Sequence, residues 1–283
     1  MRFHSLFPPD INQFKCYTHA MDSALQFATQ LARETGQLLL EYFNPRGTQT
    51  NLKEDYSVVT EADLSADKLI TEAIHKNYPA DGLISEELQP EIGTANSAVW
   101  VVDPLDGTTN FSLGLPIWGV CIARVVDGWP EIGVAYFPFL DELYSAARDS
   151  DAMMNGQVIH SQPPVPGQPS SFFSCCTRTH QHYDVSIRYK TRILGSACYT
   201  LCAVSRGMAV VGFEATPKIW DIAAGWLIAH ESGASVETMD GSKPFPLRGN
   251  FDYRSKSFPI LVGADQDLLT KSRGQIKPKM PPA

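Results

Sequence analysis

The 283-residue sequence lacks any run of about 18 consecutive apolar residues, roughly the shortest stretch that spans a membrane as a helix. We therefore expect no contact with a membrane. It also lacks an excess of positive charge, because 31 Asp and Glu outnumber 23 Lys and Arg and leave a net charge of -8. Sequence-independent binding of nucleic acid needs a basic surface, so we expect no nucleic-acid partner.

Cysteine is scarce, and its six residues are never spaced as Cys-x-x-Cys, an arrangement typical of zinc and redox sites. We interpret them as reduced thiols, and we expect no signal peptide because Pro8, Pro9 and Asp10 stand where its apolar core would lie. Both observations predict a cytoplasmic protein. Cys198 and Cys202 lie four residues apart on an expected helix and could bind a metal, but no histidine lies nearby to complete a zinc site.

The first half of the chain predicts two helices followed by a sheet. Apolar residues recur at helical spacing over 21–43 and again over 62–78. Five strand-like stretches follow, at 82–87, 99–102, 117–126, 131–137 and 143–147. Turn residues at Asp127-Gly128 and Asn155-Gly156 join them as hairpins, which predicts a large antiparallel sheet.

The second half, from residue 172 onward, alternates strands with helices as an α/β layer does. The fold class is therefore α+β with an α/β second half. A stretch at 161–170 rich in Pro, Ser and Gln predicts a boundary between an N-terminal sub-domain, 19–160, and a C-terminal one, 161–265. We expect flexible ends at 1–18 and 266–283, which show no apolar period.

A turn within the first half carries two carboxylates. The buried strand over 99–102 is expected to end at Asp103-Pro104, because proline has no N–H for the sheet. Asp103 and Asp106 then lie in a tight turn, and Gly107 lets the backbone approach a ligand closely. Such oxygen ligands suit Mg²⁺, and the Leu105 carbonyl could add another. Asp and Gly are also ordinary turn residues, so the turn alone does not require a metal.

Other acids have a structural alternative to a role in a site. Thr60 and Asp63 form the pattern of a capping box before the second helix. Asp221 begins an apolar helix, where aspartate is a common N-cap. Glu86, in a Glu-Glu pair, could be a solvated surface residue, and Glu214 could simply end a strand at the surface. The residues by themselves leave these alternatives open.

Two longer strings resemble a known family, and this resemblance favours a role in a site over a structural role for these acids. Residues 100–111, which contain the string Asp-Pro-Leu-Asp-Gly-Thr-Thr-Asn at 103–110, resemble the first signature of the inositol monophosphatase family of magnesium-dependent, lithium-sensitive sugar phosphatases. Residues 220–225, Trp-Asp-Ile-Ala-Ala-Gly, resemble its second signature. The strings at 60–63 and 85–87 resemble two further elements in the family's order. The resemblance runs from about Met21 to about Asp265 and implies a layered αβαβα sandwich and a homodimer.

The resemblance also implies a reaction: hydrolysis of a small phosphorylated polyol or sugar, first of all myo-inositol 1-phosphate, by direct attack of a metal-activated water. It implies two or three Mg²⁺ ions, most of whose ligands lie in the N-terminal sub-domain. The implied metal ligands are Glu86, Asp103, the Leu105 carbonyl, Asp106 and Asp221. The implied catalytic residues are Asp63, Glu86 and Thr108. The implied substrate-binding residues are Gly107, Thr108, Thr109, Gly195, Ser196, Ala197, Glu214 and Asp221.

Alternatives remain within the resemblance and outside it. The same fold could act on fructose 1,6-bisphosphate, histidinol phosphate, galactose 1-phosphate or a 3′-phosphoadenosine nucleotide. Gly-Thr-Thr at 107–109, where nucleotide phosphatases of the superfamily have Gly-Thr-Lys, favours a small polyol phosphate, whereas Lys218 near the sugar site could bind a second phosphate. An inactive relative that binds phosphorylated ligands is the alternative of another class, but such relatives tend to lose metal ligands, and all five acidic positions are present here.

Overall fold

The computed structural model describes residues 11–47, 51–52, 58–87, 98–165, 171–249 and 251–279. The helices of these ranges are α1 (Ile11–Tyr42), α2 (Glu61–Asn77), α3 (Thr108–Ser112), the 3₁₀ turn η1 (Pro138–Leu140), α4 (Thr177–His182), α5 (Ala197–Ser205), α6 (Ile219–Glu231) and α7 (Gln266–Arg273). The strands are β1 (Asn51–Leu52), β2 (Val58–Val59), β3 (Gly82–Ser85), β4 (Val99–Asp106), β5 (Gly119–Val126), β6 (Trp129–Phe137), β7 (Glu142–Ala147), β8 (Met153–Met154), β9 (Gln157–Val158), β10 (Phe172–Cys175), β11 (Tyr183–Val185), β12 (Lys190–Arg192), β13 (Ala209–Glu214), β14 (Ser235–Thr238), β15 (Ile260–Gly263) and β16 (Ile276–Pro278).

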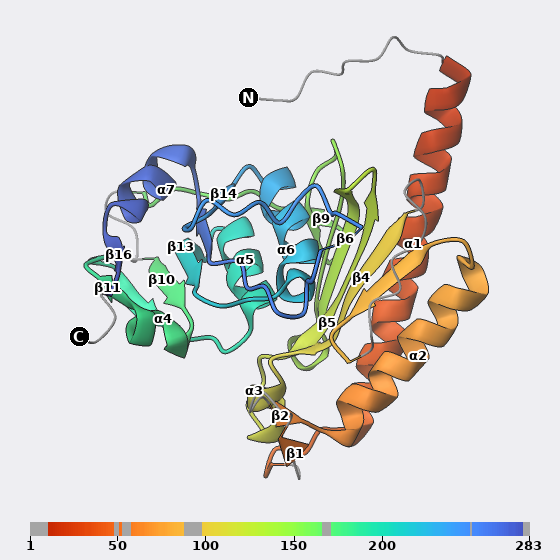
Figure 1. Cartoon of the computed structure of the whole chain (residues 1–283), viewed down its shortest axis with the longest axis horizontal. Helices are drawn as coiled ribbons and strands as arrows, with labels where there is room; N and C mark the ends of the chain where they lie inside the picture. The colour runs from red at the N-terminus through yellow and green to blue at the C-terminus, as the bar shows by residue number, and fades with distance from the viewer. Residues whose placement is uncertain are drawn as a thin grey trace.

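These elements stack in five layers, as Figure 1 shows. Helices α1 and α2 cover the outer face of the sheet that contains β4 to β6, and α5 and α6 pack between that sheet and the one that contains β10 and β13. Helices α4 and α7 lie on the far side of the second sheet. The predicted α+β fold and its αβαβα layering are confirmed. Within the described ranges, no helix is long and apolar enough to cross a bilayer.

The first sheet places the strands that lead into the site. Its described strands run in the order β3-β4-β5-β6-β7-β8-β9, with β3 and β4 parallel and the other pairs antiparallel. Trp100 and Val102 of β4 join the core beneath α1 and α2, whereas Val99 and Val101 join the core with α5 and α6. Because helices cover both faces, this strand is a continuous apolar run rather than an alternating one.

Strand β4 does not end where its proline predicts. It continues to Asp106, with Asp103 opposite Cys121 and Asp106 opposite Gly119 on β5. The register shifts between these pairs, so β4 has one more residue than its partner, and Pro104 lies inside this bulge, where no ladder N–H is needed. The expected end of the strand at Asp103-Pro104 is therefore wrong, and both aspartates lie in a bulge at the C-terminal end of β4.

The second sheet also has a mixed pattern. Its described strands run in the order β12-β10-β13-β15-β14. Strand β10 is parallel to β12 and β13, whereas β15 is antiparallel to β13 and β14. The loop that leaves β12 carries Gly195 to the start of α5, and the loop that leaves β13 leads into α6, whose first turn carries Asp221 and which packs against the first sheet.

Both ends of the chain are more ordered than predicted. Helix α1 begins at Ile11, inside the stretch expected to be a loose arm, and residues 1–10 lie outside the described ranges. Asp265 caps α7, whose Leu269 is buried, and β16 pairs with β11. The expectation of a flexible tail over 266–283 is wrong as far as residue 279. A helix as short as α7 is stabilised by the side that it buries, and it is too short for an apolar period to show in the sequence. The division near residue 160 stays a prediction.

Candidate active site

Three carboxylates from distant parts of the chain meet at one edge of the first sheet. Glu86 follows the end of β3, Asp103 lies in the bulge of β4, and Asp221 lies in the first turn of α6. Parallel pairing of β3 and β4 brings the first two to the same edge. Oxygen atoms of Glu86, Asp103 and Asp221 all lie within 4.8 Å of one another.

The electrostatics of this carboxylate cluster favour a bound cation. Burial raises the pKa of Asp103 well above its usual range, and the charges of Glu86, Asp106 and Asp221 raise it further. Burial likewise raises the pKa of Asp221 to about 7, and Glu86 adds to the shift. Buried like charges are costly unless a cation lies among them. Converging oxygen ligands without sulfur or nitrogen suit Mg²⁺ or Ca²⁺, so these residues fit the metal that the sequence implies.

Asp106, the other predicted metal ligand of the bulge, holds the bulge against α5. Its carboxylate accepts hydrogen bonds from the Ser196 hydroxyl, from the Ala197 N–H at 3.2 Å and from the Cys198 N–H at 2.9 Å. A carboxylate at a helix N-terminus is electrostatically favoured. Asp106 is therefore not among the three residues that converge within 4.8 Å, and its oxygen instead lies beside the thiols of Cys121 and Cys198.

Asp63 serves the cap of α2 and faces the bulge at the same time. One of its oxygens accepts from the N–H and hydroxyl of Thr60, which completes the capping box. The other lies 3.1 Å from the hydroxyl of Thr108, which is also 3.0 Å from the Leu105 carbonyl. The two alternatives that the sequence left open are therefore compatible. Burial raises the pKa of Asp63, whereas its hydrogen bonds with Thr60 lower it, and the net effect is a raised pKa. A carboxylate with a raised pKa takes up a proton more readily.

The predicted substrate residues of the second half lie at the start of α5 and at the end of β13. Gly195, Ser196 and Ala197 form the entry of α5, and Ser196 caps it. Glu214 ends β13 but is buried, so it is not a surface residue. The Thr200 hydroxyl donates to it at 2.7 Å, and burial raises its pKa to about 7. A protonated or hydrogen-bonded carboxyl in this place can recognise hydroxyl or ammonium groups of a ligand.

Asn110 is a residue beside the site that the sequence interpretation did not single out. Its side-chain amide donates at 2.7 Å to the carbonyls of both Ile117 and Leu194, and so joins the loop after β4 to the loop before α5. Gly195 passes so close that a Cβ atom there would lie 2.6 Å from the Asn110 Oδ1. Asn110 is the last residue of the eight-residue string at 103–110, and its place in that string was the sequence signal that could have identified it.

The segment over 251–259 lies beside the carboxylate cluster, and the sequence interpretation did not predict its contacts. The Lys218 ammonium donates to the Arg254 carbonyl at 2.6 Å and the Ser255 carbonyl at 3.2 Å. Arg254 in turn donates to the Glu86 carbonyl at 3.1 Å. Lys218 is thus engaged with this segment, which weakens the expectation that it binds a second phosphate. No local pattern pointed to these contacts, because they join residues far apart in the chain.

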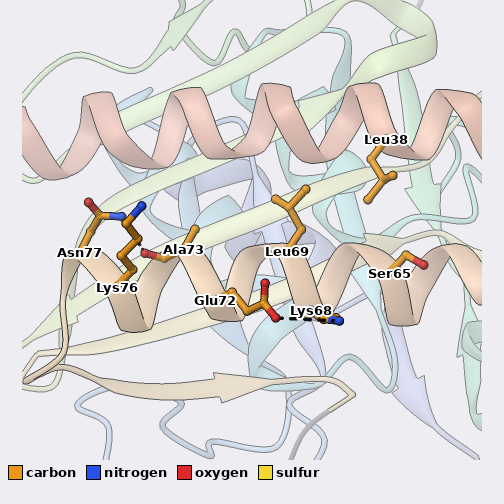
Figure 2. Close-up of a pocket in the computed structure, with 8 residues that line it drawn as sticks. All are labelled: Leu38, Ser65, Lys68, Leu69, Glu72, Ala73, Lys76 and Asn77. Atoms are coloured by element: carbon orange, nitrogen blue, oxygen red, sulfur yellow. Dashed lines mark hydrogen bonds and ion pairs between the residues drawn. The ribbon is translucent and has the colours of Figure 1, made fainter.

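A hollow between α1 and α2 lies apart from this site (Figure 2). Its lining residues are Leu38, Ser65, Lys68, Leu69, Glu72, Ala73, Lys76 and Asn77. Lys68 and Glu72 form an exposed ion pair of 3.9 Å across one turn of α2. None of the residues of the candidate site lines it, so we assign the hollow no part in the chemistry.

Comparison with known proteins gives consistent results. The sequence profile of the inositol monophosphatase family matches residues 20–276. A protein of Chlorobaculum parvum named histidinol-phosphatase is 36% identical over 224 residues, which cover 75% of this chain and 85% of that protein. The Nus factor SuhB of Pasteurella multocida is 34% identical over 247 residues, which cover 81% of this chain and 90% of that protein.

Solved structures show the same fold. The extragenic suppressor protein suhB of Bartonella henselae superposes with a TM-score of 0.76 at 29% identity, covering 89% of this chain and 98% of that one. An IMPase of Thermotoga maritima superposes with a TM-score of 0.72 at 25% identity, covering 89% of this chain and 97% of that one.

Proposed function

Since the chain belongs to the inositol monophosphatase family of phosphatases, we propose that it hydrolyses a small phosphate monoester with Mg²⁺, and that its substrate is myo-inositol 1-phosphate. The observation that carries the proposal is the convergence of the Glu86, Asp103 and Asp221 oxygens within 4.8 Å. Like charges oppose the close approach of three carboxylates from separate elements, whereas a phosphatase needs such a cluster to hold its metal ions.

The metal ligands follow from the cluster. Glu86, Asp103 and Asp221 would hold two or three Mg²⁺ ions, with the Leu105 carbonyl and Asp106 as further ligands on the bulge. When bound, the ions supply positive charge that lowers the pKa of a water and neutralises the phosphoryl oxygens. Replacement of the repulsion among these acids by attraction to a cation also explains why the fold tolerates them.

The remaining residues position the reactants. The Thr108 hydroxyl holds the attacking water, and Asp63, 3.1 Å behind it, accepts the proton through that hydroxyl. The backbone N–H groups of Gly107 and Thr108, with Thr109 beside them, bind the phosphate. The entry of α5 over 195–197 and the buried Glu214 bind the hydroxyls of the polyol, and Asp221 borders them. Water attacks the phosphorus directly, so no side chain forms a covalent intermediate.

Histidinol phosphate is a second candidate substrate, favoured by two observations. A relative named histidinol-phosphatase is 36% identical to this chain. The buried Glu214 carboxyl would pair with the ammonium group of such a substrate better than with a neutral ring. A substrate with a second phosphate has less support, because Lys218 is engaged with the carbonyls of Arg254 and Ser255.

The proposal is tested by phosphate release from a panel of monoesters. We would assay myo-inositol 1-phosphate, histidinol phosphate, galactose 1-phosphate, fructose 1,6-bisphosphate and a 3′-phosphoadenosine nucleotide with Mg²⁺, with EDTA, and with Mg²⁺ plus Li⁺. Release from inositol 1-phosphate that needs Mg²⁺ and is inhibited by Li⁺ is expected. Preference for histidinol phosphate would keep the metal chemistry and change the substrate. Metal binding without release from any ester would favour a non-catalytic ligand-binding protein.

Two further parts of the proposal concern the molecule in the cell. We place it in a reducing compartment such as the cytoplasm, because the described cysteines Cys121, Cys175, Cys176, Cys198 and Cys202 are free thiols. We also propose a homodimer on the resemblance alone, and light scattering during size-exclusion chromatography measures it.

A further inference from the structure

Directly behind the bulge lies a group of thiols that the proposed reaction does not use. Cys121 lies on β5, and Cys198 and Cys202 lie one turn apart on α5. All three are buried, with exposed fractions of 1% or less. The thiol of Cys198 interacts with those of Cys121 and Cys202. Three sulfur atoms from two different layers of the fold therefore meet in one place.

A carboxylate completes the group. One oxygen of Asp106 and the sulfurs of Cys121 and Cys198 all lie within 4.8 Å of one another. The sequence suggested Cys198 and Cys202 as a metal pair that lacked further ligands. The tertiary structure supplies a third thiol, from Cys121, and an oxygen, from Asp106, so no histidine is needed.

The arrangement matches what a soft divalent cation requires. Zn²⁺ binds thiolate at about 2.3 Å in a tetrahedron, so neighbouring ligand atoms lie about 3.8 Å apart. Ligand atoms that are within 4.8 Å need to approach by about 1 Å, which side-chain rotation can supply. Three sulfurs favour Zn²⁺ or Cd²⁺ over Mg²⁺, whereas the carboxylate cluster on the other side has only oxygen ligands.

We propose that Cys121, Cys198, Cys202 and Asp106 form a second metal site, which binds a thiophilic divalent cation such as Zn²⁺ or Cd²⁺. Asp106 lies on the same bulge as Asp103, and the proposed function uses it as a further Mg²⁺ ligand. A cation among the thiols holds the Asp106 carboxylate, keeps it from Mg²⁺ and so inhibits the enzyme. Metal–sulfur bonds form as S–H bonds break, the protons pass to solvent, and nothing is oxidised. The binding part is independent of the proposed function, whereas the inhibition part rests on it.

The binding part is tested with Cd²⁺ alone. Cd²⁺ is titrated into the full reduced chain in excess Mg²⁺, and the thiolate-to-Cd²⁺ charge-transfer absorption in the ultraviolet is followed. We expect a band that saturates at one Cd²⁺ per chain. Cys121→Ser and Cys202→Ser should each weaken binding about tenfold or more. Cys175→Ser, which removes another buried thiol outside the group, is the matched control and should leave the titration unchanged.

Two variants on different elements keep the test decisive if one of them fails to fold, which near-ultraviolet circular dichroism reports. Absence of the band in the wild-type chain would overturn the proposal. So would a band that survives both substitutions, or one that Cys175→Ser abolishes.

The inhibition part is measured as phosphate release in excess Mg²⁺ with increasing Cd²⁺, relative to the uninhibited rate of each variant. The wild type should be inhibited over the same Cd²⁺ range that produces the band, and Cys121→Ser should need about tenfold more Cd²⁺. Equal inhibition of a Cys121→Ser chain that has lost the band would overturn the link through Asp106. A chain without phosphatase activity that still shows the band would contradict the proposed function and leave the metal site intact.

Discussion

Several acids of the site have a structural and a chemical role at the same time. Asp63 caps α2 with one oxygen and faces Thr108 with the other. Asp221 accepts from the Lys218 N–H at 2.7 Å at the start of α6 and still belongs to the carboxylate cluster. A carboxylate has about four lone-pair directions, so a cap uses only part of its capacity. A substitution at these positions therefore changes both folding and chemistry, and variants have to be chosen to separate the two.

Asp103 is the residue at which the chemistry can be tested most cleanly, because an asparagine oxygen can still accept the hydrogen bond that the Leu105 N–H donates to Asp103. Asp103→Asn keeps the shape and removes a charge that a metal needs. We expect a loss of almost all Mg²⁺-dependent phosphate release, about 1,000-fold, with unchanged circular dichroism. Asp151→Asn, at an exposed position, is the control. Mg²⁺-dependent activity at the wild-type level in Asp103→Asn would contradict the assignment.

Thr108 offers a second test at the residue scale. Thr108→Val removes the hydroxyl between Asp63 and the Leu105 carbonyl but keeps the branched shape. We expect kcat to fall about 100-fold, because proton transfer through the hydroxyl is lost, with little change in KM. Thr108→Ser restores the hydroxyl and should keep most of kcat. A rise in KM at constant kcat would instead assign Thr108 to substrate binding.

At the scale of elements, the site depends on how β4 ends. The bulge turns Asp103 and Asp106 out of the regular ladder, and Gly107 then reverses the chain with φ of 91° into α3. A Cβ atom on Gly107 would lie 2.9 Å from the Ile117 carbonyl oxygen. The left-handed conformation and the close approach both require glycine here.

Gly107→Ala should therefore destabilise the fold more than a glycine-to-alanine substitution at another position of positive φ where the new Cβ atom meets no neighbour. The left-handed strain costs about 1–2 kcal/mol, and the clash adds roughly another 1–3 kcal/mol. Gly156→Ala is the matched control, because Gly156 has φ of 78° and its Cβ would meet nothing within 4 Å. Urea unfolding of both variants gives the two free energies. Equal losses of stability would mean that the contact with Ile117 does not matter.

At the scale of the whole molecule, the two sheets meet at the site through the α5–α6 layer. Asp106 binds the N-terminus of α5, and Asn110 joins the loops of the two sheets at Ile117 and Leu194. Burial of several acids at this junction is unfavourable in the metal-free protein, so the stability of the whole fold is coupled to protons and metal ions.

We therefore expect the melting temperature of the metal-free protein to fall as pH rises from about 4 to 7. The pKa values of Asp221 and Glu214 are raised from 3.8 and 4.5 to about 7, so the folded state binds more protons in this range and loses that stabilisation as they dissociate. Added Mg²⁺ should raise the melting temperature, and more at pH 8 than at pH 5, because protons no longer compete for the carboxylates.

Scanning fluorimetry over this pH range with EDTA or with Mg²⁺ measures both effects. NaCl of equal ionic strength is the control for screening. A rise of the melting temperature with pH in EDTA, or an Mg²⁺ effect that is equal at both pH values, would contradict this account of the cluster.

The sequence by itself determined what depends on neighbours along the chain. Apolar period, hairpin turns and two signature strings predicted the layers, the family and the acids of the site, including Glu86, Asp103 and Asp221. The tertiary structure alone decided where the elements touch. It extended β4 past Pro104, ordered the tail as α7 and β16, and engaged Lys218 with Arg254. It also brought Cys121 beside Cys198, because distances between remote residues follow from how layers pack and not from local pattern.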